Sequence, residues 1–95
     1  MKKENTITIN DHKYTIERNY KDGFDGERIK ELYTDFFDDY DYIFGDFSAD
    51  KLRLKGFYDS NNKKSTSIND IKGLDKYIKN FCNYECRYFL IKKIK

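Results

Sequence analysis

The chain has no proline and no tryptophan, only one histidine and two cysteines among its 95 residues. A lone histidine, His12, argues against Ser–His or Cys–His catalysis, because the base in such sites is a histidine held beside the nucleophile. It also argues against a zinc site within one chain, which takes four cysteine or histidine ligands. The sequence contains no Gly-x-Ser-x-Gly, phosphate-loop or His-Glu-x-x-His motif. These absences exclude the commonest motif-defined enzyme classes, and we expect no cofactor.

Long hydrophobic runs are also missing. No stretch approaches the roughly 18 apolar residues that a membrane span needs. The basic start of the chain is followed by no apolar segment, so it does not read as a signal peptide. We therefore expect a cytoplasmic protein, in which Cys82 and Cys86 would stay reduced. Their Cys-x₃-Cys spacing also differs from the Cys-x-x-Cys of redox pairs.

The chain is rich in aromatic residues and poor in small aliphatic ones. The chain has nine tyrosines and eight phenylalanines, but no valine and a single alanine. Each aromatic side chain can bury about 150–250 Å². The net charge of +2 is also low for a disordered chain. We therefore expect one compact domain over residues 1–95 with an aromatic-rich core.

Charge is distributed unevenly along the chain. Residues 20–50 carry three bases and ten acids, a net charge of −7, whereas residues 51–95 carry twelve bases and four acids, a net charge of +8. In one interpretation the two segments neutralise each other across the fold. In the other, the basic half forms a surface for an anionic partner.

Five segments have the residue pattern of β-strands. Apolar and polar side chains alternate in the first two, which are joined by Asn10-Asp11, a pair typical of tight turns. The remaining segments are rich in aromatic and branched side chains. The predicted strands are residues 6–9, 13–18, 40–47, 51–58 and 87–94.

Two segments have the pattern of one-sided helices. After a helix-capping Asp25, apolar side chains recur at positions 29, 32, 33, 36, 37 and 40, which predicts a continuous helix. A second helix is predicted over residues 72–82, starting near Gly73. The order ββαββαβ predicts an α+β fold, a mainly antiparallel five-stranded sheet with both helices packed on one face.

The hairpin over residues 40–58 carries two glycines inside its strands, Gly45 and Gly56. Glycine weakens a strand interior, so it usually marks a bulge or a close approach by another group. If residues 48–50 form a three-residue loop, Gly45 faces Arg53, Phe44 faces Leu54, and Ile43 faces Lys55.

This register predicts a candidate binding face. Ile43, Arg53, Lys55 and Phe57 would share one side of the hairpin, opposite a core side that holds Phe44, Leu52 and Leu54. Cations contact phosphates, and an exposed ring can stack on a base of single-stranded RNA. We expect a non-enzymatic binding domain that contacts RNA or a protein partner through this face. Alternatively, the apolar pair lies under another element and the cations are merely solvated.

A second hypothesis is a small metal-dependent hydrolase or nuclease. Asp41 and Asp46 would supply carboxylates for a divalent ion, with Lys55 beside them. Aspartates are abundant in this chain, so the pattern is weak. In the assumed register Asp46 points inward with Phe44, where a carboxylate more often accepts hydrogen bonds from a loop.

Several motifs, in order and at compatible spacing over nearly the whole chain, are similar to those of the YutD-like family of small proteins from Gram-positive bacteria. They occupy residues 22–25, 40–46, 52–57, 61–62, 74–77 and 81–89. Two positions depart from the family pattern: Phe47 replaces a tryptophan, and Glu85 replaces the glycine between the cysteines. The resemblance supports the fold and implies no catalytic role.

Overall fold

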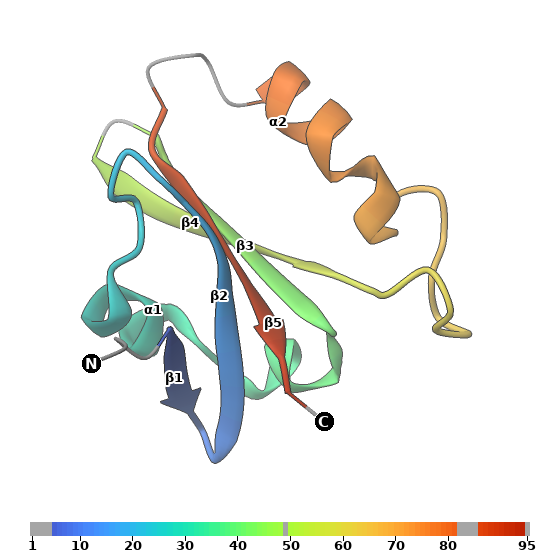
Figure 1. Cartoon of the computed structure of the whole chain (residues 1–95), viewed down its shortest axis with the longest axis horizontal. Coiled ribbons are helices and arrows are strands. Elements are labelled where there is room, and N and C mark those ends of the chain that lie inside the picture. The colour runs from blue at the N-terminus through green and yellow to red at the C-terminus, as the bar shows by residue number, and fades with distance from the viewer. Residues whose placement is uncertain (1–4, 49, 82–85, 95) are drawn as a thin grey trace.

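The computed structural model describes residues 5–48, 50–81 and 86–94, and its fold is α+β (Figure 1). Five strands form one antiparallel sheet in the order β1-β2-β5-β3-β4, which confirms the predicted class. The strands are β1 (Thr6–Ile9), β2 (His12–Tyr20), β3 (Tyr42–Ser48), β4 (Lys51–Phe57) and β5 (Tyr88–Lys93). The helices are α1 (Gly26–Leu32), η1 (Asp35–Asp39), η2 (Ile71–Gly73) and α2 (Leu74–Phe81), of which η1 and η2 are 3₁₀ turns.

The turn between β1 and β2 forms as the sequence predicts. Asn10 and Asp11 have φ angles of 51° and 67°, a left-handed pair that suits the twist of a two-residue hairpin. Asparagine and aspartate tolerate this region better than most residues. The register pairs Ile9 with His12. The hairpin therefore points Tyr14, which is fully buried, into the core.

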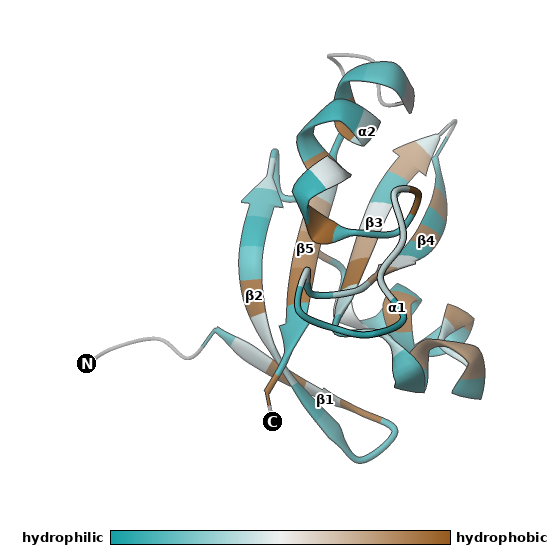
Figure 2. Cartoon of the chain, turned by 90° about the vertical axis from the view of Figure 1, so that its right-hand side faces the viewer, coloured by the Kyte–Doolittle hydropathy of each residue, from teal (hydrophilic) through white to brown (hydrophobic). Residues whose placement is uncertain are grey.

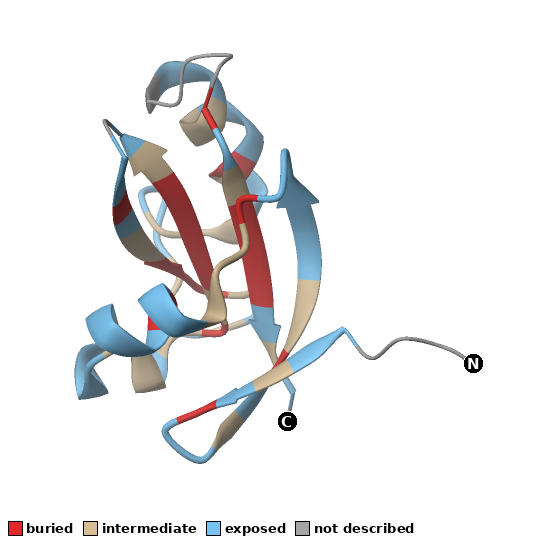
Figure 3. Cartoon of the chain, turned by 90° about the vertical axis from the view of Figure 1, so that its left-hand side faces the viewer, coloured by how far each residue is buried: buried red, intermediate tan, exposed pale blue. Residues whose placement is uncertain are grey.

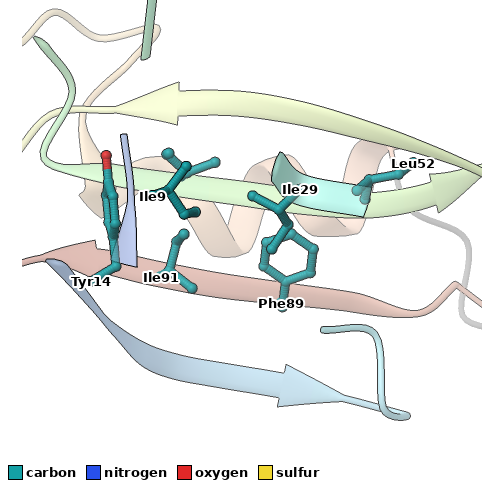
Figure 4. Packing of buried hydrophobic residues seen from close by; sticks show 7 residues of the cluster. Ile9, Tyr14, Ile29, Leu52, Phe89 and Ile91 are labelled. Carbon is teal, nitrogen blue, oxygen red and sulfur yellow. The ribbon is translucent and has the colours of Figure 1, made fainter. Parts of the chain in front are cut away.

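The central strands β3 and β5 are buried on both sides, and the two longer helices cover opposite faces of the sheet (Figures 1 and 2). On one side, the α1 face, Ile29 of α1 packs with Phe89 of the sheet (Figure 4), and Ile43 belongs to the same cluster. On the other side, the α2 face, Leu74 of α2 packs with Phe44. The prediction that both helices lie on one face is wrong. Consecutive apolar residues in β3 and β5 point to alternate sides, so each strand supplies two cores.

The predicted continuous helix over residues 29–40 is also wrong. Helix α1 ends at Leu32, and Tyr33 and Thr34 are extended, with ψ angles of 134° and 173°. The Thr34 hydroxyl then accepts a hydrogen bond from the backbone of Phe36 at 3.3 Å and starts η1. Because the chain turns here, Phe36 is 66% exposed instead of facing the core.

The β3–β4 hairpin is shifted by one residue from the predicted register. Ser48 pairs with Lys51, so two residues separate the strands instead of three. Lys55 consequently faces Phe44, and Ile43 faces Gly56. Leu52 and Leu54 still pack in the core, as predicted, but on the α1 face. Phe44 lies on the α2 face.

Both strand glycines mark close approaches, as the sequence predicts. A Cβ atom on Gly45 would lie 2.1 Å from the Phe89 ring, and one on Gly56 would lie 2.3 Å from the Tyr40 ring. These distances are far below van der Waals contact, so each ring occupies the space that the missing side chain leaves open.

The segment after β4 differs from expectation mainly at its cysteines. Gly73 lies in η2 directly before α2, as predicted. Cys82 lies outside the described residues. Cys86 is disulfide-bonded, so the expectation of a reduced thiol at this position, which was based on compartment alone, is wrong. No helix among the described residues is long and apolar enough to cross a membrane.

Candidate functional site

Arg53 and Lys55 lie on β4. This strand forms one of the two edges of the sheet (Figure 3). Side chains two residues apart on a strand share a face, and here they share the α2 face, beside Tyr77 of α2. Arg53 faces Asp46 across the ladder, and Lys55 faces Phe44. The sheet therefore brings both cations to one flank of α2.

A buried carboxylate fixes Arg53. The guanidinium donates from Nε to Asp46 Oδ1 at 3.1 Å and from a terminal nitrogen to Oδ2 at 2.6 Å. Asp46 is 1% exposed, whereas the Arg53 side chain is half exposed. These hydrogen bonds raise the pKa of Arg53. Arginine has five N–H donors, and among the described residues only Asp46 accepts from this side chain, so the outer donors face solvent.

Among the described residues, aromatic rings hold Lys55 and no carboxylate pairs with it. Its ammonium lies 5.2 Å from the ring centre of Phe57 and 5.5 Å from that of Tyr77. Such cation–π contacts contribute about 0.5–2 kcal/mol. Within the described part of the chain no acid forms an ion pair with Lys55, although Lys64 pairs with Asp39 at 2.7 Å. Lys55 is thus a half-buried cation that two rings hold in position and that forms an ion pair with no described acid.

Burial raises the pKa of the Tyr77 phenol, and the nearby Asp46 raises it further. The ring beneath Lys55 therefore stays neutral at physiological pH, and it keeps the quadrupole that attracts the ammonium group.

The structure separates the four residues of the predicted binding face. Phe57 lies with Arg53 and Lys55 but is 1% exposed beneath Tyr77, with ring centres 5.8 Å apart. Ile43 is fully buried on the α1 face. Grouping Ile43 with the cations is therefore wrong, because the one-residue register shift moves it to the other side. The binding role of Arg53 and Lys55 stays a prediction.

The carboxylates of the hydrolase hypothesis do not converge. Asp41 and Asp46 lie five residues apart along an extended segment, roughly 16 Å at 3.3 Å per residue. The Asp41 carboxylate accepts hydrogen bonds from the backbone of Asp59 at 2.8 Å and from the side chain of Asn62 at 3.0 Å. No group of three potential metal ligands forms among the residues that the structure describes. The arrangement therefore gives a metal-dependent hydrolase no support.

The sequence did not show that β4 forms an edge of the sheet. The odd-numbered residues of β4 bond to β3, so the backbone groups of Leu52, Leu54 and Gly56 point away from the sheet. In the described residues no group bonds to these outward amides and carbonyls. Beyond them the edge is closed, because Tyr58 donates to Asn69 at 2.7 Å and accepts from Ile71 at 2.9 Å.

A groove of about 570 Å³ lies beside this edge, between α1 and the start of β4. Leu32 and Leu52 give it an apolar part, and Glu27, Glu31 and Asp50 are among its acidic lining residues. Leu32 is 43% exposed. Sequence reasoning missed the groove because it placed Leu32 in the core of a longer helix.

The chain combines a five-stranded antiparallel sheet, helices on both faces of that sheet, and the sequence motifs described above. This α+β protein belongs to the YutD-like family. Residues 8–92 match the family described as "Putative antitoxin YutD-like". The chain is 44% identical over 89 residues to the Bacillus subtilis (strain 168) protein named "Putative antitoxin YutD", covering 94% of this chain and 98% of that one. The solution NMR structure of protein yutD from B. subtilis matches with a TM-score of 0.81 and 42% identity, over 99% of this chain and 86% of that one. The resemblance predicted from the sequence is confirmed.

Proposed function

We propose that this chain is a non-enzymatic binding protein that recognises an acidic surface of a protein partner through Arg53 and Lys55. The observation that carries the proposal is Lys55, which two rings hold in place while no described carboxylate balances its charge. A cation fixed before binding loses little conformational entropy when a carboxylate arrives. Arg53, held by Asp46, offers its remaining donors on the same flank.

The name of the Bacillus subtilis relative, "Putative antitoxin YutD", suggests what kind of partner this could be. An antitoxin counteracts a toxin, and it can do so by binding alone. We propose that this chain likewise works by occupying a surface of a toxin protein. Such a role needs an exposed recognition site and no catalytic group, which fits the separation of Asp41 from Asp46.

The site favours a protein partner over RNA. Binding of single-stranded RNA commonly uses aromatic side chains on which bases stack. Phe57 is buried, and Tyr77 already lies over it and beneath Lys55. Carboxylates, in contrast, need only the outward donors of Arg53 and Lys55, and charge-assisted hydrogen bonds to carboxylates are strong.

The test is affinity capture from a lysate of cells that make this chain, with and without ribonuclease, using three proteins. Wild type and Lys79→Gln should retain the same partner protein after ribonuclease treatment. Lys55→Gln should retain at least tenfold less of it. Lys79 is the matched control because it is an exposed lysine on α2. Retention should also fall as salt rises, since screening weakens exposed charge pairs.

Two results would overturn the proposal. In the first, Lys55→Gln retains the partner as well as Lys79→Gln does, so the lysine is not a recognition residue. In the second, ribonuclease removes all binding and purified single-stranded RNA binds with a steep salt dependence, so the partner is RNA.

A further inference from the structure

We propose that the partner binds by adding a β-strand to the outer edge of β4, using an extended segment with carboxylates at alternate positions. This inference rests on the proposed function and specifies the geometry of binding. Strand addition satisfies backbone groups along an exposed sheet edge, while alternate side chains determine which segment is accepted.

The first argument is the open backbone of the edge. Leu52 and Leu54 direct their amides and carbonyls outward, and no described residue bonds to them. The segment after β4 shows that this line of groups can pair, because Tyr58 already makes two backbone bonds with Asn69 and Ile71. A partner strand would continue the pairing from Tyr58 toward the β3–β4 turn.

The second argument is the alignment of the cations with that edge. Arg53 and Lys55 bond to β3, so in an antiparallel addition their new neighbours take non-hydrogen-bonded positions, where Cα atoms are about 4.5 Å apart. Side chains approach most closely at such positions, and opposite charges there stabilise the pair. Glutamate or aspartate at positions i and i+2 of the partner would meet the two cations in turn.

The third argument is the opposite character of the other face. The partner residues that alternate with the carboxylates point to the α1 face, and the one opposite Leu52 reaches the groove that holds Leu32 and Leu52. An apolar side chain fits there. Four acids and two bases line this groove, and their net negative charge would repel an acid. The edge therefore selects a segment that is acidic on one side only.

Charge also argues against a second copy of this chain as the occupant. Two β4 edges paired antiparallel would bring Lys51, Arg53 and Lys55 of each copy onto the same face. Like charges opposite each other destabilise a strand pair. At the other edge of the sheet, β1 has only four residues, and threonines occupy its α2-face positions in place of cations. That edge therefore does not favour a segment with carboxylates at alternate positions.

The experiment uses a synthetic seven-residue peptide, capped at both ends, with the sequence Thr-Glu-Val-Glu-Val-Glu-Thr. It is titrated into the isotope-labelled full chain and followed by NMR. We expect saturable binding, with chemical-shift changes centred on Leu52 and Leu54. Lys55→Gln should bind the peptide at least tenfold more weakly, and Lys79→Gln should bind it as wild type does. A peptide with lysine in place of each glutamate should bind at least tenfold more weakly.

Two N-methylated isomers of the peptide test strand addition itself. Methyl groups on alternate amides block one hydrogen-bonding edge of a strand, so one isomer should bind like the parent and the other at least tenfold more weakly. Equal binding by both isomers, shifts away from β4, or no binding by the parent peptide would each overturn strand addition. If both isomers bind equally to wild type but the parent peptide still binds more weakly to Lys55→Gln, the partner is recognised by charge and not by strand addition. The lysate capture judges the proposed function separately.

Discussion

Arg53 and Lys55 are two residues apart on one strand, yet the protein holds their charges in different ways. Arg53 neutralises Asp46, which is almost fully buried. Lys55 lies against two rings and pairs with no described acid. Substitution of Arg53 therefore leaves a buried carboxylate without its partner, whereas substitution of Lys55 removes a charge without such a consequence.

At this pair we predict that Arg53→Ala lowers the free energy of unfolding by about 2 kcal/mol. Breaking a fully buried ion pair costs about 3–5 kcal/mol, and solvent access to the half-exposed Arg53 reduces that cost. Lys55→Gln should cost less, about 0.5–1 kcal/mol, because it removes cation–π contacts at a partly exposed site. Urea unfolding measures both values. Equal stability of the two variants would contradict the structural role of Arg53.

Gly45 supports a second prediction at the residue scale. Gly45→Ala should lower the free energy of unfolding by at least about 2 kcal/mol, because the new methyl group would collide with the buried Phe89 ring. Gly73→Ala is the matched control, since nothing lies within 4 Å of its Cβ position. It should be neutral or stabilising by up to about 1 kcal/mol. Thermal unfolding of the two variants checks this, and a tolerated Gly45→Ala would count against the packing.

At the scale of the elements, the sequence predicted the strands far more accurately than it predicted the helix after Asp25. Period-two alternation and the Asn10-Asp11 turn identified β1 and β2, because these signals act over a few neighbouring residues. The apolar spacing over residues 29–40 fitted one helix just as well. The competing signal was Thr34 followed by Asp35, a capping residue and an acid suited to a new helix start.

Placement of the elements depended on information that the sequence does not contain. The pairing of Ser48 with Lys51 required a turn one residue shorter than assumed, and that single residue moved Ile43 away from Arg53 and Lys55. Arg53 and Lys55 could be predicted as neighbours because they lie on one strand. The burial of Phe57 could not, because it depends on which face α2 covers.

The break between α1 and η1 gives a prediction whose sign separates the two interpretations. Thr34→Ala should lower the free energy of unfolding by about 1 kcal/mol, because it removes the hydroxyl that caps η1. Within a continuous helix the same change would be stabilising, since alanine has the higher helix propensity. Chemical denaturation measures the sign. Thr8→Ala, at an exposed position on β1, is the control for loss of a threonine hydroxyl.

Over the whole molecule, several contacts join the acidic segment to the basic one. Lys64 pairs with Asp39, Arg53 pairs with Asp46, and Lys93 donates to the backbone carbonyl of Asp38. The fold thus brings cations from residues 51–95 against acids from residues 20–50, as one of the two interpretations of the sequence predicted. Against this background, a fixed cation without a described counterion is informative.

These contacts make stability depend on pH on the acid side. The Tyr33 hydroxyl bonded to Asp38, the Lys64 ammonium bonded to Asp39, and the Ser60 hydroxyl bonded to Asp70 each hold the pKa of that carboxyl below its usual value of 3.8. The unfolded chain therefore binds more protons in acid, and the free energy of unfolding should fall as the pH drops below about 4.

Asp70→Asn tests this dependence. The variant should unfold more easily at pH 7 but lose less stability between pH 5 and pH 2 than wild type does, because one carboxyl with a lowered pKa is gone. Asp75→Asn is the control, since Asp75 is an exposed acid on α2 whose ion pair with Arg18 lies at the surface. Urea unfolding across this pH range gives both slopes. A slope for Asp70→Asn as steep as that of wild type would contradict the assignment.

Hydrogen exchange along β4 tests the central claim, an open edge that a partner closes, most directly. In the free protein the outward amides of Leu52 and Leu54 should exchange quickly, while the inward amides of Arg53 and Lys55, which bond to β3, should be protected. In complex with the captured partner, Leu52 and Leu54 should become protected as well. Outward amides that are already slow in the free protein, or that stay fast in the complex, would contradict the account.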